Sequence, residues 1–242
     1  MMNKLYFLSF LVAAVSAQSG SGKTTRYWDC CKPSCSWSGK ADVTSPVRTC
    51  NRQGTLLTNP NAVSGCDGGD SFTCTNMSPW AVDNNTAYGF AAVNISGGNE
   101  GSWCCQCYEL SFTSGPVAGK KMIVQATNTG GDLGHNHFDI MMPGGGLGWF
   151  THGCPAQFGS WNGGAQYGGV ALVKGCQWRF DWFQGADNPS VNFKQVTCPT
   201  AITNVSGCTR RDAPKAQAPA QGQVSSSTQA PTPSKAPSSC GV

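Results

Sequence analysis

The chain has 242 residues, of which only 12% are charged, and its formal net charge is +4 at pH 7. Residues 18–209 hold 11 basic and 11 acidic side chains, so this part is neutral. Clustered basic charge is what a nucleic-acid-binding surface needs, and this balance argues against one.

The first 17 residues resemble a secretory signal peptide. Lys4 supplies a positive charge, and the apolar run 5–15 is too short to cross a bilayer, which argues against the alternative of a membrane anchor. Val15-Ser16-Ala17 is a suitable cleavage site, so we expect a secreted, extracellular protein beginning at Gln18. No later stretch of about 18 apolar residues occurs, so no membrane partner is expected.

All 14 cysteines lie beyond this leader. In a secreted protein an even number of cysteines indicates disulfides, whereas Cys30-Cys31 and Cys104-Cys105 would suggest a metal site in a cytosolic one. We therefore expect no metal and no cofactor. Four glycosylation sequons agree with secretion, at Asn76, Asn84, Asn94 and Asn204.

Residues 17–24 fit a relaxed phosphate-loop pattern, but a cleavage site at its first residue argues against nucleotide binding. A few residues later, Asp29 lies among aromatic residues, including Tyr27 and Trp37, and directly before three closely spaced cysteines. A carboxylate can activate water, aromatic rings can stack on a sugar, and disulfides can hold both in place. This segment favours an enzyme that hydrolyses a polysaccharide.

The remaining core predicts a β-rich fold with little helix. One helix is expected at 79–92, with Ser78 as its N-cap and apolar residues spaced by three and four. Abundant glycines separate short β-type runs. This pattern predicts a compact β-barrel with long loops. The expected strands are 108–113, 121–127, 137–141, 177–183 and 192–197.

A second acidic segment follows at 129–140. In an extended chain His137 and Asp139 would face a cleft, while Phe138 and Ile140 would face the core. Asp132 lies in the preceding glycine-rich turn. Two nearby carboxylates can differ in pKa, as glycoside hydrolysis requires. Taken singly, such an Asp is also a common turn former, and such a His a common structural residue.

From residue 210 to 242 the composition changes to Ala, Pro, Gln, Ser and Thr with few bulky apolar residues. Such a segment cannot bury enough surface to offset the entropy of ordering it. We expect a flexible linker or tail, glycosylated on its hydroxyls and carrying no second module.

Five segments together resemble glycoside hydrolase family 45 endoglucanases, and the similarity runs through residues 23–209. These segments are TRYWDCCKPSC (25–35), WCCQCYEL (103–110), GGDLG (130–134), NHFD (136–139) and WRFDWF (178–183). The resemblance implies a six-stranded double-psi β-barrel with an open groove, a few short helices and inverting hydrolysis of internal β-1,4-glucan bonds. The expected partner is the β-glucan polysaccharide, and we expect the protein to be a monomer.

Carried onto this sequence, the resemblance makes Asp29 the general base, Asp139 the general acid and Asp132 an assisting acid on a mobile loop. Five further residues match positions that line or support the groove: Thr25, Tyr27, Trp37, His137 and Tyr167. Six disulfides are implied, namely Cys30–Cys154, Cys31–Cys66, Cys35–Cys104, Cys50–Cys74, Cys105–Cys208 and Cys107–Cys198. The sequence leaves the pairing of Cys176 and Cys240 open.

Two other functions are alternatives to an endoglucanase. An expansin-like, non-hydrolytic glucan-binding protein would share the barrel and the acid, but such proteins lack a carboxylate matching Asp29. A disulfide-rich structural protein would leave the agreement of both acidic motifs unexplained. A single Cys240 cannot supply a small cellulose-binding module, so weak binding to crystalline cellulose is expected. The preferred glucan, whether cellulose, mixed-linkage glucan, xyloglucan or glucomannan, is left open.

Overall fold

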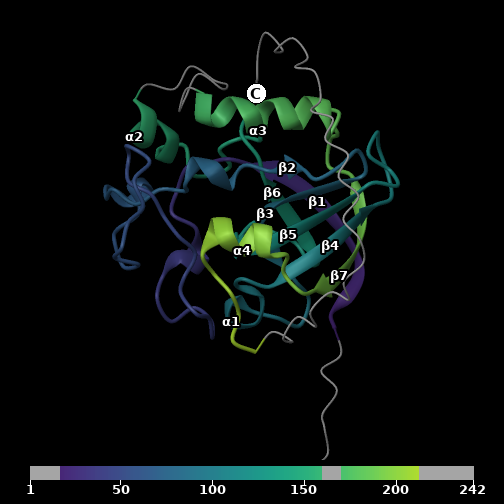
Figure 1. The fold of residues 1–242 in the computed structure, drawn as a ribbon, viewed down its shortest axis with the longest axis horizontal. Coiled ribbons are helices and arrows are strands. Elements are labelled where there is room, and N and C mark those ends of the chain that lie inside the picture. Colours follow the sequence, from purple (N-terminus) through teal and green to yellow (C-terminus); the bar gives the residue numbers. More distant parts are fainter. Residues whose placement is uncertain (1–16, 160–169, 213–242) are drawn as a thin grey trace, which may run out of the picture.

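The computed structural model describes residues 17–159 and 170–212. All but the last residue of the expected signal peptide and nearly all of the expected tail therefore lie outside the described residues. Within the described part seven strands form one sheet, in the order β2-β3-β5-β4-β7-β1-β6. Strand β6 also pairs with β3, which closes six of the strands into a barrel (Figure 1). The sequence-based expectation of a six-stranded barrel is confirmed.

The strands are β1 (Ser19–Tyr27), β2 (Trp80–Ala81), β3 (Thr86–Asn94), β4 (Cys107–Phe112), β5 (Lys121–Asn128), β6 (His137–Met141) and β7 (Ser190–Val196). The pairs β1–β6 and β3–β5 are parallel, and the other pairs are antiparallel. The described residues also form four α-helices outside the sheet: α1 (Glu100–Trp103), α2 (Gly153–Phe158), α3 (Val170–Asp181) and α4 (Thr200–Ser206). Strand β1 runs through the phosphate-loop pattern, so this segment is neither a loop nor the start of a helix.

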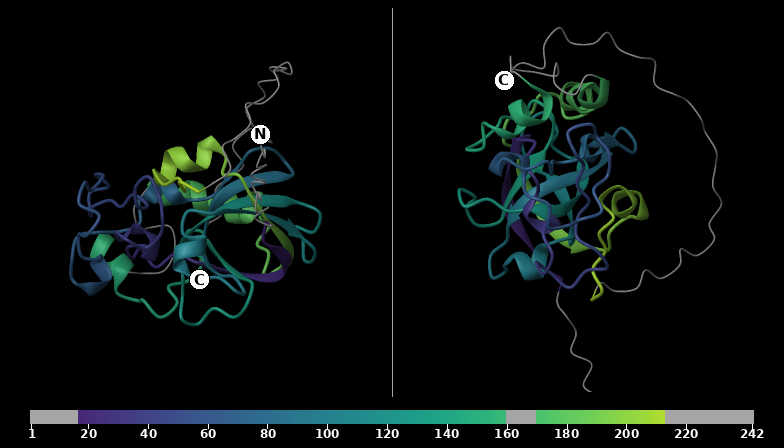
Figure 2. Two further views of the ribbon diagram at one scale, coloured as in Figure 1. Left: turned by 90° about the horizontal axis from the view of Figure 1, so that it is seen from below. Right: turned by 90° about the vertical axis from the view of Figure 1, so that its left-hand side faces the viewer.

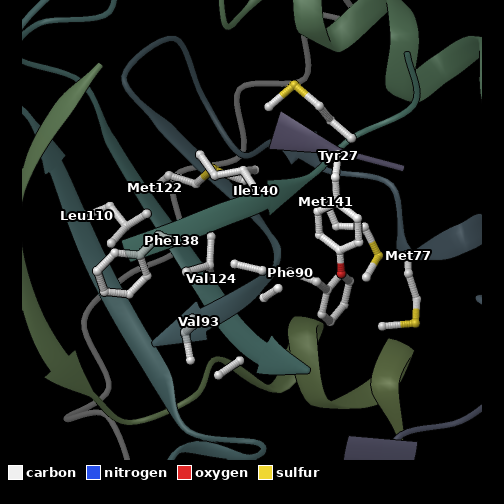
Figure 3. Close-up of a cluster of buried hydrophobic side chains, with 14 of the residues drawn as sticks. Tyr27, Met77, Phe90, Val93, Leu110, Met122, Val124, Phe138, Ile140 and Met141 are labelled. Atoms are coloured by element: carbon white, nitrogen blue, oxygen red, sulfur yellow. The ribbon is translucent and has the colours of Figure 1, made fainter. Parts of the chain in front are cut away.

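Large apolar side chains fill the barrel, as Figure 3 shows. Phe90, Leu110, Met122, Phe138 and Ile140 are fully buried there. They come from four different strands, β3 to β6. Burying side chains of this size contributes roughly 1.5–3 kcal/mol each, so the barrel is a rigid support for whatever its rim carries.

Beside the barrel lies a lobe of long loops, formed by residues 28–79 together with α2 (Figures 1 and 2). This lobe has little regular structure and is held by disulfides. All six pairings that the family resemblance implies are formed in the structure. Cys176 is disulfide-bonded as well. Cys240 lies outside the described residues.

Two expected elements are wrong. Residues 177–183 are not a strand, because α3 extends to Asp181. Aromatic residues at every second position suggest a strand here, but the buried residues follow the period of a helix. Leu172, Cys176 and Arg179 are buried at spacings of four and three. Trp178 and Trp182, four residues apart, stack with ring centroids 5.3 Å apart.

The helix expected at 79–92 is instead a hairpin of β2 and β3. The carboxylate of Asp83 accepts hydrogen bonds from the backbone N–H groups of Asn85 (2.7 Å) and Thr86 (2.8 Å). Asp83 thereby forms an Asx turn, and the backbone N–H groups of Val82 and Asp83 donate to the carbonyl of Thr86 across it, which joins the two strands as a hairpin. The apolar residues after the turn then enter the barrel as strand β3.

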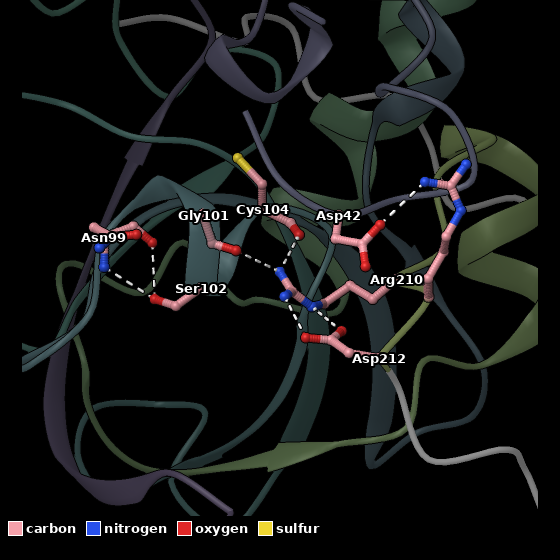
Figure 4. A network of polar contacts seen from close by, with 8 residues as sticks. Asp42, Asn99, Gly101, Ser102, Cys104, Arg210 and Asp212 are labelled. Carbon is pink, nitrogen blue, oxygen red and sulfur yellow. Dashed lines mark hydrogen bonds and ion pairs between the residues drawn. The ribbon is translucent and has the colours of Figure 1, made fainter. Parts of the chain in front are cut away.

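The first residues of the expected tail are anchored to the core (Figure 4). The guanidinium of Arg210 donates to the carbonyl oxygens of Gly101 (3.0 Å) and Cys104 (3.1 Å). It also pairs with Asp212 at 2.7 Å, and its side chain is only 8% exposed. The ordered unit therefore continues a few residues beyond the expected boundary at 209.

We expect Arg210→Ala to lower the free energy of unfolding by about 1–3 kcal/mol, because it leaves two carbonyls without their donor. Arg211→Ala is the matched control, since Arg211 and Asp42 form an ion pair in which both side chains are more than half exposed. Such a pair contributes about 0–1 kcal/mol. Denaturant unfolding of both variants measures the difference, and equal stabilities would contradict the anchoring role.

Candidate active site

Parallel pairing of β1 with β6 aligns Thr25 with Asp139. Along β6, Phe138 and Ile140 point into the core, while Asp139 lies on the other face, as the alternation predicts. The Thr25 hydroxyl donates to Asp139 Oδ1 at 2.6 Å. Neighbouring strands thus hold the carboxyl group of Asp139 in place.

A chain of hydrogen bonds extends from Asp139 to the loop that carries Asp132. Thr25 Oγ1 also lies 2.8 Å from His137 Nε2. Since the single hydroxyl proton is donated to Asp139, Nε2 of His137 carries the proton between these two atoms. His137 Nδ1 is then free to accept from the backbone N–H of Gly134 at 3.3 Å. Burial lowers the pKa of His137, which agrees with a neutral ring.

Asp29 lies two residues after the end of β1 and is 7% exposed. Its Oδ1 accepts the backbone N–H of Cys31 at 2.9 Å. The next two residues are tied to distant segments by the Cys30–Cys154 and Cys31–Cys66 disulfides. A β-carbon at Gly153 would overlap the backbone oxygen of Asp29, so only glycine fits beside this turn.

Asp29 and Asp139 line one cavity of about 210 Å³. Three parts of the chain make its walls: barrel residues including Tyr27, the loop 128–133 with Asp132, and the loop 147–150. Tyr27 is buried and its hydroxyl accepts from Asn128 Nδ2 at 3.2 Å. The cavity therefore gathers all three acidic residues that the sequence singles out.

The environment raises the pKa of both carboxyls, of which Asp29 is buried and Asp139 partly buried. Burial raises the pKa of Asp29 to about 6, against the opposing hydrogen bond from Cys31 and with a smaller contribution from the charge of Asp139. Burial also raises the pKa of Asp139 to about 6; the Thr25 hydrogen bond lowers it, and the charge of Asp132 raises it. Near pH 6 one carboxyl can therefore be protonated while the other is ionised, so that one can act as an acid and the other as a base.

Trp37 is not among the residues that line this cavity. The ammonium group of Lys32 lies 3.2 Å from the centre of its ring. The same ammonium donates to the carbonyl oxygens of Pro60 (2.6 Å) and Ala62 (2.8 Å). Trp37 is thereby fixed in the loop lobe with one face covered. Tyr167 lies outside the described residues.

Sequence reasoning missed several residues of the cavity wall, among them Asn128, Trp149 and Phe150. Asn128 also accepts the backbone N–H of Ser34 at 2.8 Å, so it connects β5 with the loop lobe. Trp149 and Phe150 follow a run of glycines at 144–146 and at 148, and an aromatic pair in such a loop is the signal that could have revealed them.

Of the four sequons, Asn76, Asn84 and Asn204 are exposed. Asn94 is partly buried, and its Nδ2 donates to the carbonyl of Leu133 at 2.8 Å. This nitrogen is the atom to which a glycan would be attached, so the three exposed positions are the better acceptors.

In the parts of the chain that the structure describes, no cluster of His, Cys, Asp or Glu could hold a metal ion. Over the same residues, no helix is both long and apolar enough to span a membrane.

Comparison with known proteins gives the family. A family model described as "Glycosyl hydrolase family 45" matches residues 21–209. The chain belongs to this family. It is 62% identical to a "Putative endoglucanase type K" of Fusarium oxysporum over 82% of the chain and 56% of the relative. It is 51% identical to an "Endoglucanase" of Cryptopygus antarcticus over 88% of the chain and all of the relative.

A solved structure agrees with the family 45 fold. The crystal structure of a cellulase from the Antarctic springtail Cryptopygus antarcticus has a TM-score of 0.74 and 53% identity, and covers 80% of this chain and 99% of that one. The chain spans little more than half the length of the Fusarium relative, so that protein's full activity is not transferred here. The family and its named members support an endoglucanase type of hydrolase.

We expect single substitutions around Asp139 to move its pKa in opposite directions. Asp132→Asn removes a nearby negative charge and lowers the pKa, whereas Thr25→Val removes a hydrogen bond to the carboxylate and raises it. NMR titration of the Asp139 carboxyl carbon measures both shifts. Asp67→Asn, an exposed carboxylate outside the cavity, is the control and leaves the pKa unchanged. Shifts in the same direction for both variants would contradict this account.

Proposed function

We propose that the protein is a secreted endo-β-1,4-glucanase that hydrolyses internal bonds of cellulose or a related β-glucan. One observation carries the proposal: two carboxyls with raised pKa values, one buried and one partly buried, line a single cavity in a chain of glycosyl hydrolase family 45. The names of the relatives, endoglucanase and cellulase, support the same substrate class. Six disulfides suit an oxidising, extracellular location.

In the proposed reaction Asp139 is the general acid and Asp29 the general base. Asp139 protonates the glycosidic oxygen as the bond to the anomeric carbon breaks, while Asp29 removes a proton from the attacking water. The charge of Asp132 raises the pKa of Asp139, which favours the protonated form that an acid needs. Asp29 must be ionised, so both conditions are met in the same molecule near pH 6.

The proposed reaction inverts the anomeric centre. Inversion needs a water between the base and the sugar, and carboxyl groups roughly 6.5–9.5 Å apart leave room for it. A cavity of about 210 Å³ beside Asp29 and Asp139 offers space for such a water next to a bound sugar ring. Tyr27, on the cavity wall, adds an apolar surface next to Asp29.

Asp29→Asn and Asp139→Asn are each expected to reduce hydrolysis of soluble β-1,4-glucan by about 100-fold or more, because general acid–base groups contribute roughly 10²–10⁴-fold. Release of reducing ends measures the rate. Near-normal activity in either variant would contradict the assigned roles. A wild-type protein that binds glucan without releasing reducing ends would instead favour the expansin-like function.

A stability measurement shows that these variants remain folded. Both carboxyls have a higher pKa in the folded state than the ordinary value of 3.8. The folded protein therefore binds more protons than the unfolded chain between about pH 4 and 6, and ionisation costs stability as pH rises through that range. Each Asn variant should be at least as stable as the wild type at pH 7, and this advantage should disappear below about pH 4.

Inversion has its own test. Proton NMR of the first products formed from a β-1,4-glucan oligosaccharide should show the α-anomer at the new reducing end, before mutarotation mixes the two forms. The reason is that water attacks the face opposite the leaving oxygen. A β-anomer appearing first would indicate retention and would exclude Asp29 as a simple base.

A further inference from the structure

Two large apolar side chains are exposed at the edge of the cavity. Trp149 is 73% exposed and Phe150 is 55% exposed, which makes Trp149 the most exposed of the large hydrophobic residues that the structure describes. Both line the cavity that contains Asp29 and Asp139. Exposed apolar groups at a functional cavity are typical of a surface that a ligand covers.

The loop that carries these rings is held firmly by its backbone. The carbonyl of Gly146 accepts the backbone N–H of Trp28 at 2.7 Å, next to Asp29 in sequence. The guanidinium of Arg179 on α3 donates to the carbonyl of Gly144. A β-carbon at Gly145 would overlap the backbone at Arg26 and Tyr27, so the loop packs directly on the end of β1.

Two consequences follow from this arrangement. Because Trp149 is largely exposed, its ring adds little to the stability of the fold. Because the backbone at 144–146 is tied to β1 and α3, the loop carries the ring beside the catalytic pair. A Trp side chain has only two χ angles, so it loses little conformational entropy when a ligand covers it.

We propose that Trp149 is a stacking platform for one pyranose ring of a β-1,4-glucan chain bound across the cavity. The proposal rests on the proposed glucanase function and adds a substrate-binding residue to it. In a β-1,4-linked glucan the hydroxyl groups project from the ring edges and leave C–H groups on the ring faces, which pack on an indole. Phe150 extends the apolar surface alongside.

An uncharged polymer fits this surface better than a charged partner. Of the residues that line the cavity, only Asp29, Asp132 and Asp139 carry ionisable carboxylates, and none carries a basic group. A polyanion would be repelled by these carboxylates. The rings at the edge also continue directly into the cavity, so the occupant that covers Trp149 is the molecule that reaches the catalytic pair.

Trp149→Ala tests the platform, with Trp149→Tyr as the conservative variant. Val82→Ala is the matched control, because Val82 is 50% exposed and lies outside the cavity lining. Loss of one aromatic stacking surface should raise KM for soluble β-1,4-glucan by about five- to tenfold. The thermal midpoint should stay unchanged, and the Tyr variant should keep most of the affinity.

Binding measured without turnover separates the platform from the proposed function. In an Asp139→Asn background, calorimetric titration with cellohexaose should show the same five- to tenfold weakening when Trp149 is replaced by Ala. Unchanged binding in that double variant, a lowered thermal midpoint, or equal loss in Val82→Ala would overturn the platform. Failure of the wild type to release reducing ends would overturn the glucanase function instead, and the titration would still report on Trp149.

Discussion

The parallel pairing of β1 with β6 is the contact on which the site depends. It joins residues more than a hundred positions apart and aligns Thr25 with Asp139, and β1 then continues directly to Asp29. Closure of the barrel through β3 and β6 fixes the second edge of β6. A shift of this pairing by one residue would turn Asp139 into the core and Phe138 toward the cavity.

Two kinds of structure position the site residues around this pairing, the barrel and the loop lobe. The barrel, with its buried aromatic and aliphatic core, positions Thr25, His137 and Asp139. The loop lobe has little regular structure, and disulfides hold Asp29 there instead of a strand ladder. The two carboxyls meet where these two parts of the fold adjoin, because both line the same cavity. Burial keeps each of them partly away from water, and their pKa values rise for that reason.

The parts of the fold that could be predicted from sequence are those with a clear local period. Residues 137–141 form β6 with the expected alternation, and 121–127 and 108–113 match β5 and β4 to within a residue or so. Strand β1 was not expected because its first residues are glycines and serines with no apolar alternation, and only the ladder with β6 and β7 makes it a strand. Aromatic residues at every second position hid the helix α3. At the site, Asp29, Asp132 and Asp139 stood out through their motifs, whereas Trp149 stood out only through its exposure beside the cavity.

Neighbouring cysteines with different partners have a consequence for how the protein reaches its native state. Cys30 and Cys31 bond to Cys154 and Cys66, and Cys104 and Cys105 bond to Cys35 and Cys208. An exchange of partners within either pair would keep the number of bridges while moving the chain by one residue, and at Cys30 and Cys31 it would displace Asp29. Such isomers interconvert only by thiol–disulfide exchange, which takes seconds to hours. A disulfide isomerase in the folding compartment would therefore decide the yield of active protein more than the stability of the barrel would.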